Sequence, residues 1–150
     1  MPETKIIVAL QDHEHVEGLV NLACELARGA EAEVVALHVV EVGPGLPLNA
    51  DDEVLDRSGK QLLALAQQLA SQKFSKEITT RLVRARQAGQ AIVREAEEHA
   101  VDLIILGHHS KISYMAKALF GSVVEYVTEH APCRVIVQTV PVAQVKMAAA

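Results

Sequence analysis

Two glycines and a serine in the C-terminal half have the types and spacing of an anion-binding turn. Gly107 directly follows the strongly apolar run at residues 101–106, and Gly121 and Ser122 come later in the chain. A glycine after a buried strand lets the chain turn sharply and lets backbone N–H groups approach a phosphate, to which a serine hydroxyl can donate. The pattern therefore suggests a phosphate site. The alternative is that Gly107 only turns the chain and Gly121 only permits close helix packing.

Four histidines follow two of the predicted strands. They are His13, His15, His108 and His109. Imidazole is a common ligand of zinc and neighbouring metals, and it titrates near neutral pH. Together with the carboxylates of Asp12 and Glu14, the four rings suggest a transition-metal site or a pH-sensitive cluster. We favour the simpler interpretation that these histidines are solvated side chains at the edge of a crevice.

Three cationic side chains also lie close to the ends of predicted strands. Arg84 and Arg86 follow the predicted strand at 78–83, and Lys111 comes shortly after Gly107. Three cations at one crevice would suit a phosphorylated or dinucleotide ligand. The alternative is that they belong to the solvated surface.

The composition fits an intracellular domain and excludes several classes of protein. The 150 residues are 50% hydrophobic but only 3% aromatic, and the formal net charge is −5. The acidic balance and the scarcity of aromatic side chains argue against a nucleic-acid-binding surface. Cys24 and Cys133 form no CxxC pair, and no apolar stretch has the length of a signal peptide core or a membrane span. We therefore expect a cytoplasmic protein without membrane insertion.

Apolar runs alternate with helical patterns along the chain. Short runs rich in β-branched residues predict strands, and apolar residues three and four apart predict helices. The predicted strands are 6–10, 33–42, 78–83, 101–106 and 133–140, and the predicted helices are 16–27, 51–72, 89–100 and 115–130. Strands separated by helices pair in parallel through right-handed crossovers. The pattern predicts one α/β domain over residues 1–150, with an open, doubly wound, five-stranded parallel sheet, a core at about 3–140 and a frayed tail at 141–150.

Several segments resemble the universal stress protein family. They are KIIVALQDHEH at 5–15, LHVVEV at 37–42, LIILGHHS at 103–110 and LFGSVVEYVTEHAPCRVIV at 119–137. The family usually shows a glycine, two residues, a second glycine, nine residues and Gly-Ser, and later His-Ala-Pro-Cys-Pro-Val. Gly107, Gly121-Ser122 and residues 130–133 match this pattern, whereas Arg134 replaces the second proline. The resemblance covers residues 3–140 and implies a Rossmann-like, adenine nucleotide alpha hydrolase-like fold with helices on both faces and sheet order 3-2-1-4-5.

The resemblance also implies positions around a nucleotide. They are Ala9, Gln11, Val39, Gly107, Ser110, Lys111, Gly121 and Ser122. Val39 corresponds to a valine beside adenine, but Gln11 replaces the aspartate that contacts the nucleoside in ATP-binding members. Ser110 replaces the second motif glycine, with ten residues instead of nine before Gly121, and Arg86 lies near another usual glycine. ATP or AMP, an altered phosphorylated ligand and no nucleotide therefore stay open.

For function, the resemblance implies a ligand-binding regulatory module in a stress response, with an adenine nucleotide as candidate cofactor. A nucleotide-independent interaction or transporter-regulating module is one alternative, and a metal or pH sensor built on the histidines is another. We assign no catalytic residue, because no serine lies in a GxSxG pattern and Cys133 opens a strand expected to be buried. Slow ATP hydrolysis is the most that the resemblance suggests.

The last predicted strand carries an interaction surface. Val135–Val140 is an apolar run expected at a sheet edge, and such an edge is a template for pairing with another chain. In the family this edge commonly forms a twofold homodimer, which uses up the edge. The alternative is that the C-terminal tail covers it.

Overall fold

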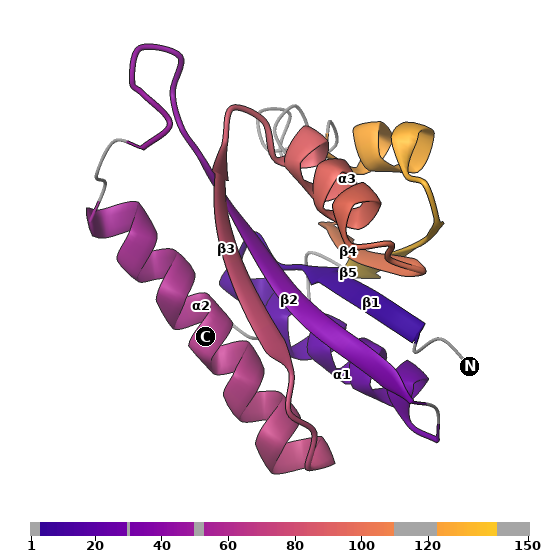
Figure 1. Cartoon of the computed structure of the whole chain (residues 1–150). Helices are drawn as coiled ribbons and strands as arrows, with labels where there is room; N and C mark the ends of the chain where they lie inside the picture. The colour runs from indigo at the N-terminus through magenta and orange to yellow at the C-terminus, as the bar shows by residue number, and fades with distance from the viewer. Residues whose placement is uncertain (1–3, 30, 50–52, 110–122, 141–150) are drawn as a thin grey trace.

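The computed structural model describes residues 4–29, 31–49, 53–109 and 123–140, in which strands and helices alternate as expected (Figure 1). In chain order they are β1 (Thr4–Ala9), the 3-10 helix η1 (His13–His15), α1 (Val16–Ala27), β2 (Ala32–Glu41), α2 (Glu53–Phe74), β3 (Thr79–Ala85), α3 (Ala88–Glu98), β4 (Leu103–His109) and β5 (Arg134–Val140). Residues 123–130 are also helical. The rest of the helix predicted at 115–130 lies outside the described residues.

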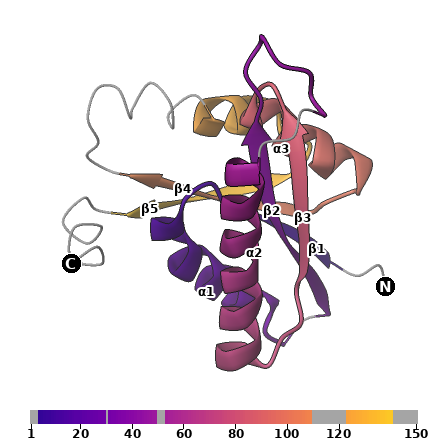
Figure 2. The same ribbon diagram turned by 90° about the vertical axis from the view of Figure 1, so that its left-hand side faces the viewer.

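The strands form one parallel sheet in the order β3-β2-β1-β4-β5. This confirms the predicted doubly wound α/β sheet and the strand order that the resemblance implied. Figure 2 shows the strong twist between β2–β3 and β4–β5, which follows from the handed twist of each strand. From β1 the chain adds β2 and β3 on one side of the sheet and then β4 and β5 on the other, so the order of the strands reverses between β1 and β4. Sheets of this kind open a crevice beyond the carboxyl ends of the strands at that point.

Helices cover both faces of the sheet, with α1 and α2 on one side and α3 and the segment 123–130 on the other (Figure 1). Successive residues of a strand point to opposite faces. In β1, Val8 therefore packs with α1 and α2, while Ile7 packs with α3. The core is aliphatic, as the composition predicts. Cys24 is buried in it, whereas Cys133 is only half-buried, contrary to the expectation.

Two strands are longer than predicted, and this changes the placement of several site candidates. β4 continues through Gly107 and the two following histidines, because these residues stay paired with β5; Gly107 faces Gln138 in the register. β3 continues through Ala85, because its pairing with β2 extends to Glu41. Gly107 and Arg84 therefore lie inside strands and not in the turns after them. The expectation that Gly107 turns the chain is wrong.

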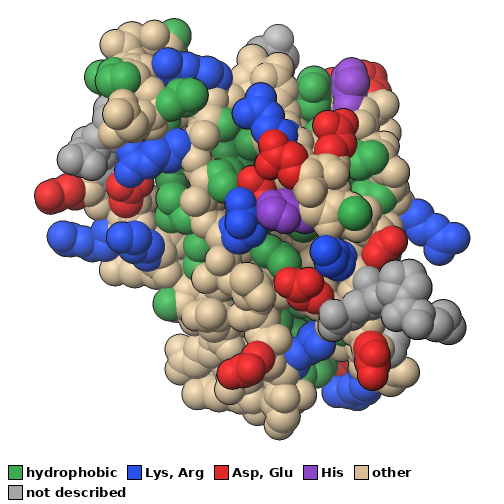
Figure 3. Space-filling model, in the orientation of Figure 1, with side chains coloured by type: hydrophobic (Ala, Val, Ile, Leu, Met, Phe, Trp, Pro, Cys, Tyr) green, Lys and Arg blue, Asp and Glu red, His purple; other side chains and the backbone are tan. Residues whose placement is uncertain are grey.

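The surface carries mixed charge. Figure 3 shows acidic and basic side chains interspersed on the face that it displays, without a continuous basic stripe there. Among the described residues, no helix is both long enough and apolar enough to cross a membrane.

Candidate functional site

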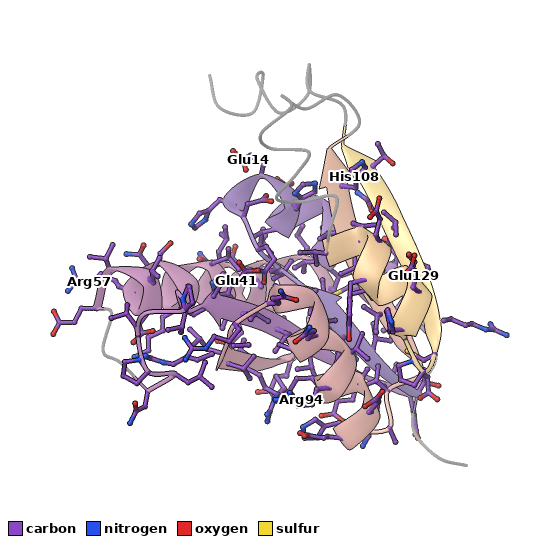
Figure 4. All side chains as sticks on the ribbon, turned by 90° about the horizontal axis from the view of Figure 1, so that it is seen from above. Glu14, Glu41, Arg57, Arg94, His108 and Glu129 are labelled. Carbon is purple, nitrogen blue, oxygen red and sulfur yellow. The ribbon has the colours of Figure 1, made fainter. Side chains whose placement is uncertain are left out.

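The carboxyl ends of β1 and β4 meet at a small pocket of about 30 Å³. It is lined by Ala9, Gln11, Asp12, His15, Leu19, Leu106, Gly107, His108, Val123 and Val124. Seen from above, Glu14 of η1 and His108 of β4 lie on the same side of the molecule (Figure 4). The structure therefore brings together the two sequence-distant segments from which a crevice was expected.

Only part of the predicted nucleotide set lies within the described residues. Ala9, Gln11 and Gly107 line the pocket, and Val39 contacts Gln11. The remaining members, Ser110, Lys111, Gly121 and Ser122, lie outside the described residues.

Gln11 extends the pairing of β1 with β2 by means of its side chain. The backbone N–H of Leu10 donates to the carbonyl of Leu37 at 2.8 Å. Beyond that point the Gln11 side chain takes over: its Nε2 donates to the Val39 carbonyl at 3.2 Å, and its Oε1 accepts from the Val39 N–H at 3.1 Å. One carboxamide thus satisfies both backbone polar groups of Val39, which is 2% exposed.

Asp12 and His15 form a pair that shapes η1. One Asp12 carboxylate oxygen accepts from the His15 backbone N–H at 3.0 Å, which caps the helix, and His15 Nδ1 lies 2.8 and 2.9 Å from the two carboxylate oxygens. Burial by itself would raise the pKa of Asp12. The hydrogen bonds and the charge of His15 outweigh burial and hold the pKa of this carboxyl below its usual value.

Gly107 makes room for the His15 ring. A Cβ at position 107 would lie 2.3 Å from His15 Cδ2, closer than any side chain tolerates. His15 is buried, so its ring fills the space directly over the strand. The glycine was predicted to let a phosphate approach the backbone, but the group that approaches it in this structure is an imidazole.

The two described arginines of the predicted cation set have structural partners. Arg84 forms an ion pair with Asp56 of α2. Arg86 Nη1 donates to the carbonyls of Gly43 and Leu46, both at 2.6 Å, and so holds the loop after β2. Neither guanidinium is therefore a spare cation for a crevice ligand, because each is committed to a neighbouring segment.

The histidines have different environments. His13 is exposed, and His15 is buried with its Nδ1 directed at Asp12. His108 Nδ1 is buried without a hydrogen-bond partner among the described residues, and the side chain of His109 is not described. The structure thus brings His15 and His108 to the same pocket but leaves His13 on the surface.

A cluster of three titratable side chains near the other end of the sheet was not predicted from the sequence. Glu95, Glu98 and His99 are the described residues whose candidate metal-ligand atoms lie within 4.8 Å of one another. Glu95 already accepts from Arg81 at 2.8 and 3.2 Å and lies 3.3 Å from His99 Nε2. The signal in the sequence was the four-residue spacing of Glu95 and His99 on a predicted helix.

The family model described as "Universal stress protein family" matches residues 3–138. The chain belongs to the universal stress protein family. A universal stress protein of Methanocaldococcus jannaschii is 33% identical over 125 residues, which is 79% of this chain and 72% of that protein. One from Methanothermobacter thermautotrophicus is 32% identical over 134 residues, covering 85% of this chain and 90% of the relative.

A solved member of the family has the same fold. The universal stress protein from Archaeoglobus fulgidus, solved in complex with dAMP, aligns with a TM-score of 0.70 at 23% identity. The alignment covers 91% of this chain and 98% of that chain. The likeness confirms the Rossmann-like α/β fold that the resemblance implied.

Proposed function

We propose that this chain binds an adenine nucleotide at the carboxyl ends of β1, β2 and β4 and acts as a ligand-binding regulatory module in a stress response. The observation that carries the proposal is the backbone of Val39. Its N–H and C=O both face the β1 side at a level where β1 has ended, since the last pair of the β1–β2 register is Ala9 with Leu37. A strand end of this kind offers a donor and an acceptor to a ligand.

Adenine matches that backbone pair. Its exocyclic amino group can donate to the Val39 carbonyl, and its neighbouring ring nitrogen can accept from the Val39 N–H. The adjoining crevice between β1 and β4, where the strand order reverses, is where nucleotides bind in sheets of this architecture. The dAMP held by the Archaeoglobus relative supports an adenine nucleotide over other ligands.

The phosphate end rests on the resemblance to the family. We propose that Ser110, Lys111, Gly121 and Ser122 hold the phosphates, with Ala9 and Gly107 at the floor of the site. Because the His15 ring lies over Gly107, direct approach of a phosphate to this glycine requires the ring to move. Phosphate contacts are therefore assigned to the residues that follow β4.

Nucleotide content and thermal stability test the proposal. Purified protein is denatured, and released adenine nucleotide is quantified; thermal unfolding is then followed with AMP and with ATP plus Mg²⁺. A ligand that binds only the folded state stabilises it by about 2.7 kcal/mol at 100 times its Kd. Co-purified nucleotide or a shift of this kind is expected. Absence of both contradicts nucleotide binding.

A nucleotide-independent interaction module is the second candidate. The observation in its favour is the contact between Gln11 and Val39, which uses the donor and acceptor that a base would need. Metal analysis of the same sample tests the histidine alternative. Stoichiometric zinc that is lost on His108→Ala would favour a metal sensor over both other functions.

We also propose that the chain forms a twofold homodimer through β5. β5 is the outermost strand of the sheet and pairs with β4 on one side, and no strand in the described part of the chain pairs with its other edge, where we propose that a second copy binds. Sedimentation should give a dimer mass, and Ile136→Lys or Gln138→Pro should shift it to a monomer. A monomeric wild type at micromolar concentration contradicts the proposal.

We propose a cytoplasmic location because of the state of the two cysteines. Cys24 and Cys133 are both free thiols; Cys24 lies in the core on one face of the sheet, and the half-buried Cys133 packs against the core on the other face. Burial raises the pKa of each thiol, which keeps it protonated and unreactive. Two unpaired thiols are typical of a reducing compartment. Cell fractionation with an antibody to the chain tests this placement.

A further inference from the structure

We propose that Gln11 is a built-in competitor for the nucleobase. Its carboxamide occupies the backbone pair of Val39, so an adenine nucleotide binds only when this side chain swings away. The inference rests on the proposed function, because it concerns how the same site admits its ligand. It makes Gln11 a residue that sets affinity and base specificity in this chain.

The geometry makes the two occupants mutually exclusive. Gln11 Oε1 accepts from the Val39 N–H at 3.1 Å, and this N–H is a single donor that cannot serve a second acceptor well. Gln11 Nε2 also donates to the Val39 carbonyl at 3.2 Å, so the carboxamide lies across both polar groups of Val39. A base and the carboxamide therefore cannot both pair with Val39.

The carboxamide presents the same hydrogen-bonding pattern as adenine. In each case an NH₂ group donates to the carbonyl, and an adjacent acceptor receives the N–H. Hypoxanthine has a carbonyl and a ring N–H at these positions, which is the opposite order. Adenine can therefore replace the two hydrogen bonds that Val39 loses when Gln11 moves away, whereas hypoxanthine cannot.

The contact is favourable when no ligand is present. Val39 is 2% exposed, so an unpaired N–H or C=O there would be costly. The backbone around Gln11 is fixed on both sides: His38 Nδ1 donates to the Leu10 carbonyl at 2.7 Å, and Asp12 caps η1. Opening therefore requires only rotation of the Gln11 side chain while its backbone stays in place.

Calorimetric titration of AMP tests the competition. Gln11→Ala removes the competitor and should bind AMP about tenfold more tightly than the wild type, since two neutral hydrogen bonds no longer have to be exchanged. IMP should gain less than twofold. Gln68→Ala on the exposed side of α2 is the matched control and should leave AMP affinity unchanged.

Hydrogen exchange gives a readout that needs no nucleotide. In the wild type the Val39 amide should exchange slowly, and in Gln11→Ala it should exchange at least tenfold faster, while the Leu10 amide stays protected. Gln11→Met is the second variant if Gln11→Ala does not fold. Methionine has a similar length but can neither donate to the Val39 carbonyl nor accept well from the Val39 N–H, so AMP affinity should also rise.

Different results would overturn the competitor proposal and the proposed nucleotide binding. Equal or weaker AMP binding by both Gln11 variants, with measurable binding by the wild type, overturns the competitor and leaves the proposed function standing. An unchanged exchange rate of the Val39 amide in Gln11→Ala also overturns the proposal that Gln11 is a competitor. If wild type and both folded variants bind no AMP at a millimolar concentration, the proposed function is overturned, and the competitor with it.

Discussion

Two pockets on the sheet differ in volume and in what their polar groups do, and the smaller one is the better candidate site. The pocket at the carboxyl ends of β1 and β4 measures about 30 Å³, against about 130 Å³ for one near the start of β1 and β2 beside α3. In the larger pocket, Arg81 is paired with Glu95 and Lys5 Nζ donates to the His99 carbonyl at 3.2 Å. At the smaller pocket, a glutamine meets a backbone pair that a ligand can also use. The smaller pocket is therefore chosen for hydrogen-bonding groups that a ligand can take over, and not for its volume.

Gly107 lines the smaller pocket, and substitution there is expected to have the largest effect on stability. In Gly107→Ala the new Cβ would lie 2.3 Å from His15 Cδ2, and His15 is held by Asp12, so the ring has little freedom to yield. Overpacking of this kind costs about 2 to 3 kcal/mol. Urea denaturation measures the loss in the free energy of unfolding.

A matched glycine gives the control for this variant. A Cβ at Gly45, in the loop after β2, would meet nothing within 4 Å, so Gly45→Ala should change stability by less than about 0.5 kcal/mol. The double variant His15→Ala/Gly107→Ala should lose less than the sum of the two single variants, with a coupling of about 1 kcal/mol or more. Additive losses would show that the ring and the glycine do not contact each other.

Asp12 should give the next largest effect, and one that depends on pH. Asp12→Ala removes both the cap of η1 and the partner of the His15 ring, for about 2 kcal/mol at neutral pH; Asp12→Asn keeps a capping oxygen and should lose about half of that. Because the pKa of Asp12 is lowered on folding, its contribution is complete above the ordinary carboxyl range near pH 4 and is lost as the pH falls through the folded value. Urea denaturation at pH 7 and near pH 3 should therefore show a smaller difference between wild type and Asp12→Asn in acid. A constant difference contradicts the assignment.

The parallel α/β sheet could be predicted from the sequence because several strands contain continuous aliphatic runs, whereas the strand order came from the resemblance to the family. Residues 6–9 of β1 and 104–106 of β4 are buried aliphatic runs whose strand type needs no tertiary information. The extension of β4 past Gly107 could not be predicted, since a glycine and two histidines interrupt the apolar pattern, and pairing with β5 decides the boundary. The same holds for Arg84, which pairing with β2 keeps inside β3.

For the site, sequence identified positions but not contacts. Gln11 and Val39 were named through the resemblance, yet only the rotamer of Gln11 shows that they bind each other. The three-residue spacing of Asp12 and His15 is a signal of a capped helical turn that sequence analysis could have used. Arg86 was predicted to be either a cation for a crevice ligand or part of the solvated surface, because nothing local to the sequence reveals the carbonyls of residues 43 and 46 that it contacts.

Glu95 tests whether the larger pocket takes part in ligand binding. Glu95→Gln removes the charge that pairs with Arg81, whose side chain is 41% exposed, so solvent screening limits the loss to about 1 kcal/mol. AMP affinity should stay within twofold of the wild type, because the larger pocket lies toward the other end of the sheet. Glu97→Gln, an exposed neighbour on α3, is the control and should be neutral. A change in AMP affinity with Glu95→Gln would make the larger pocket part of the site.

The smallest effect is expected at His99, and it tests whether the acidic group beside the larger pocket binds metal. His99 is 45% exposed on its side chain, so His99→Ala should change the free energy of unfolding by less than about 0.5 kcal/mol. Zinc would have to compete for Glu95 with Arg81, which makes two hydrogen bonds to that carboxylate, and release of the guanidinium would leave it without its partner. Addition of 0.1 mM zinc should therefore shift neither the melting temperature of the wild type nor that of His99→Ala. Stabilisation of the wild type that His99→Ala abolishes would show that the ion pair yields to a metal, and the larger pocket would then have a function of its own.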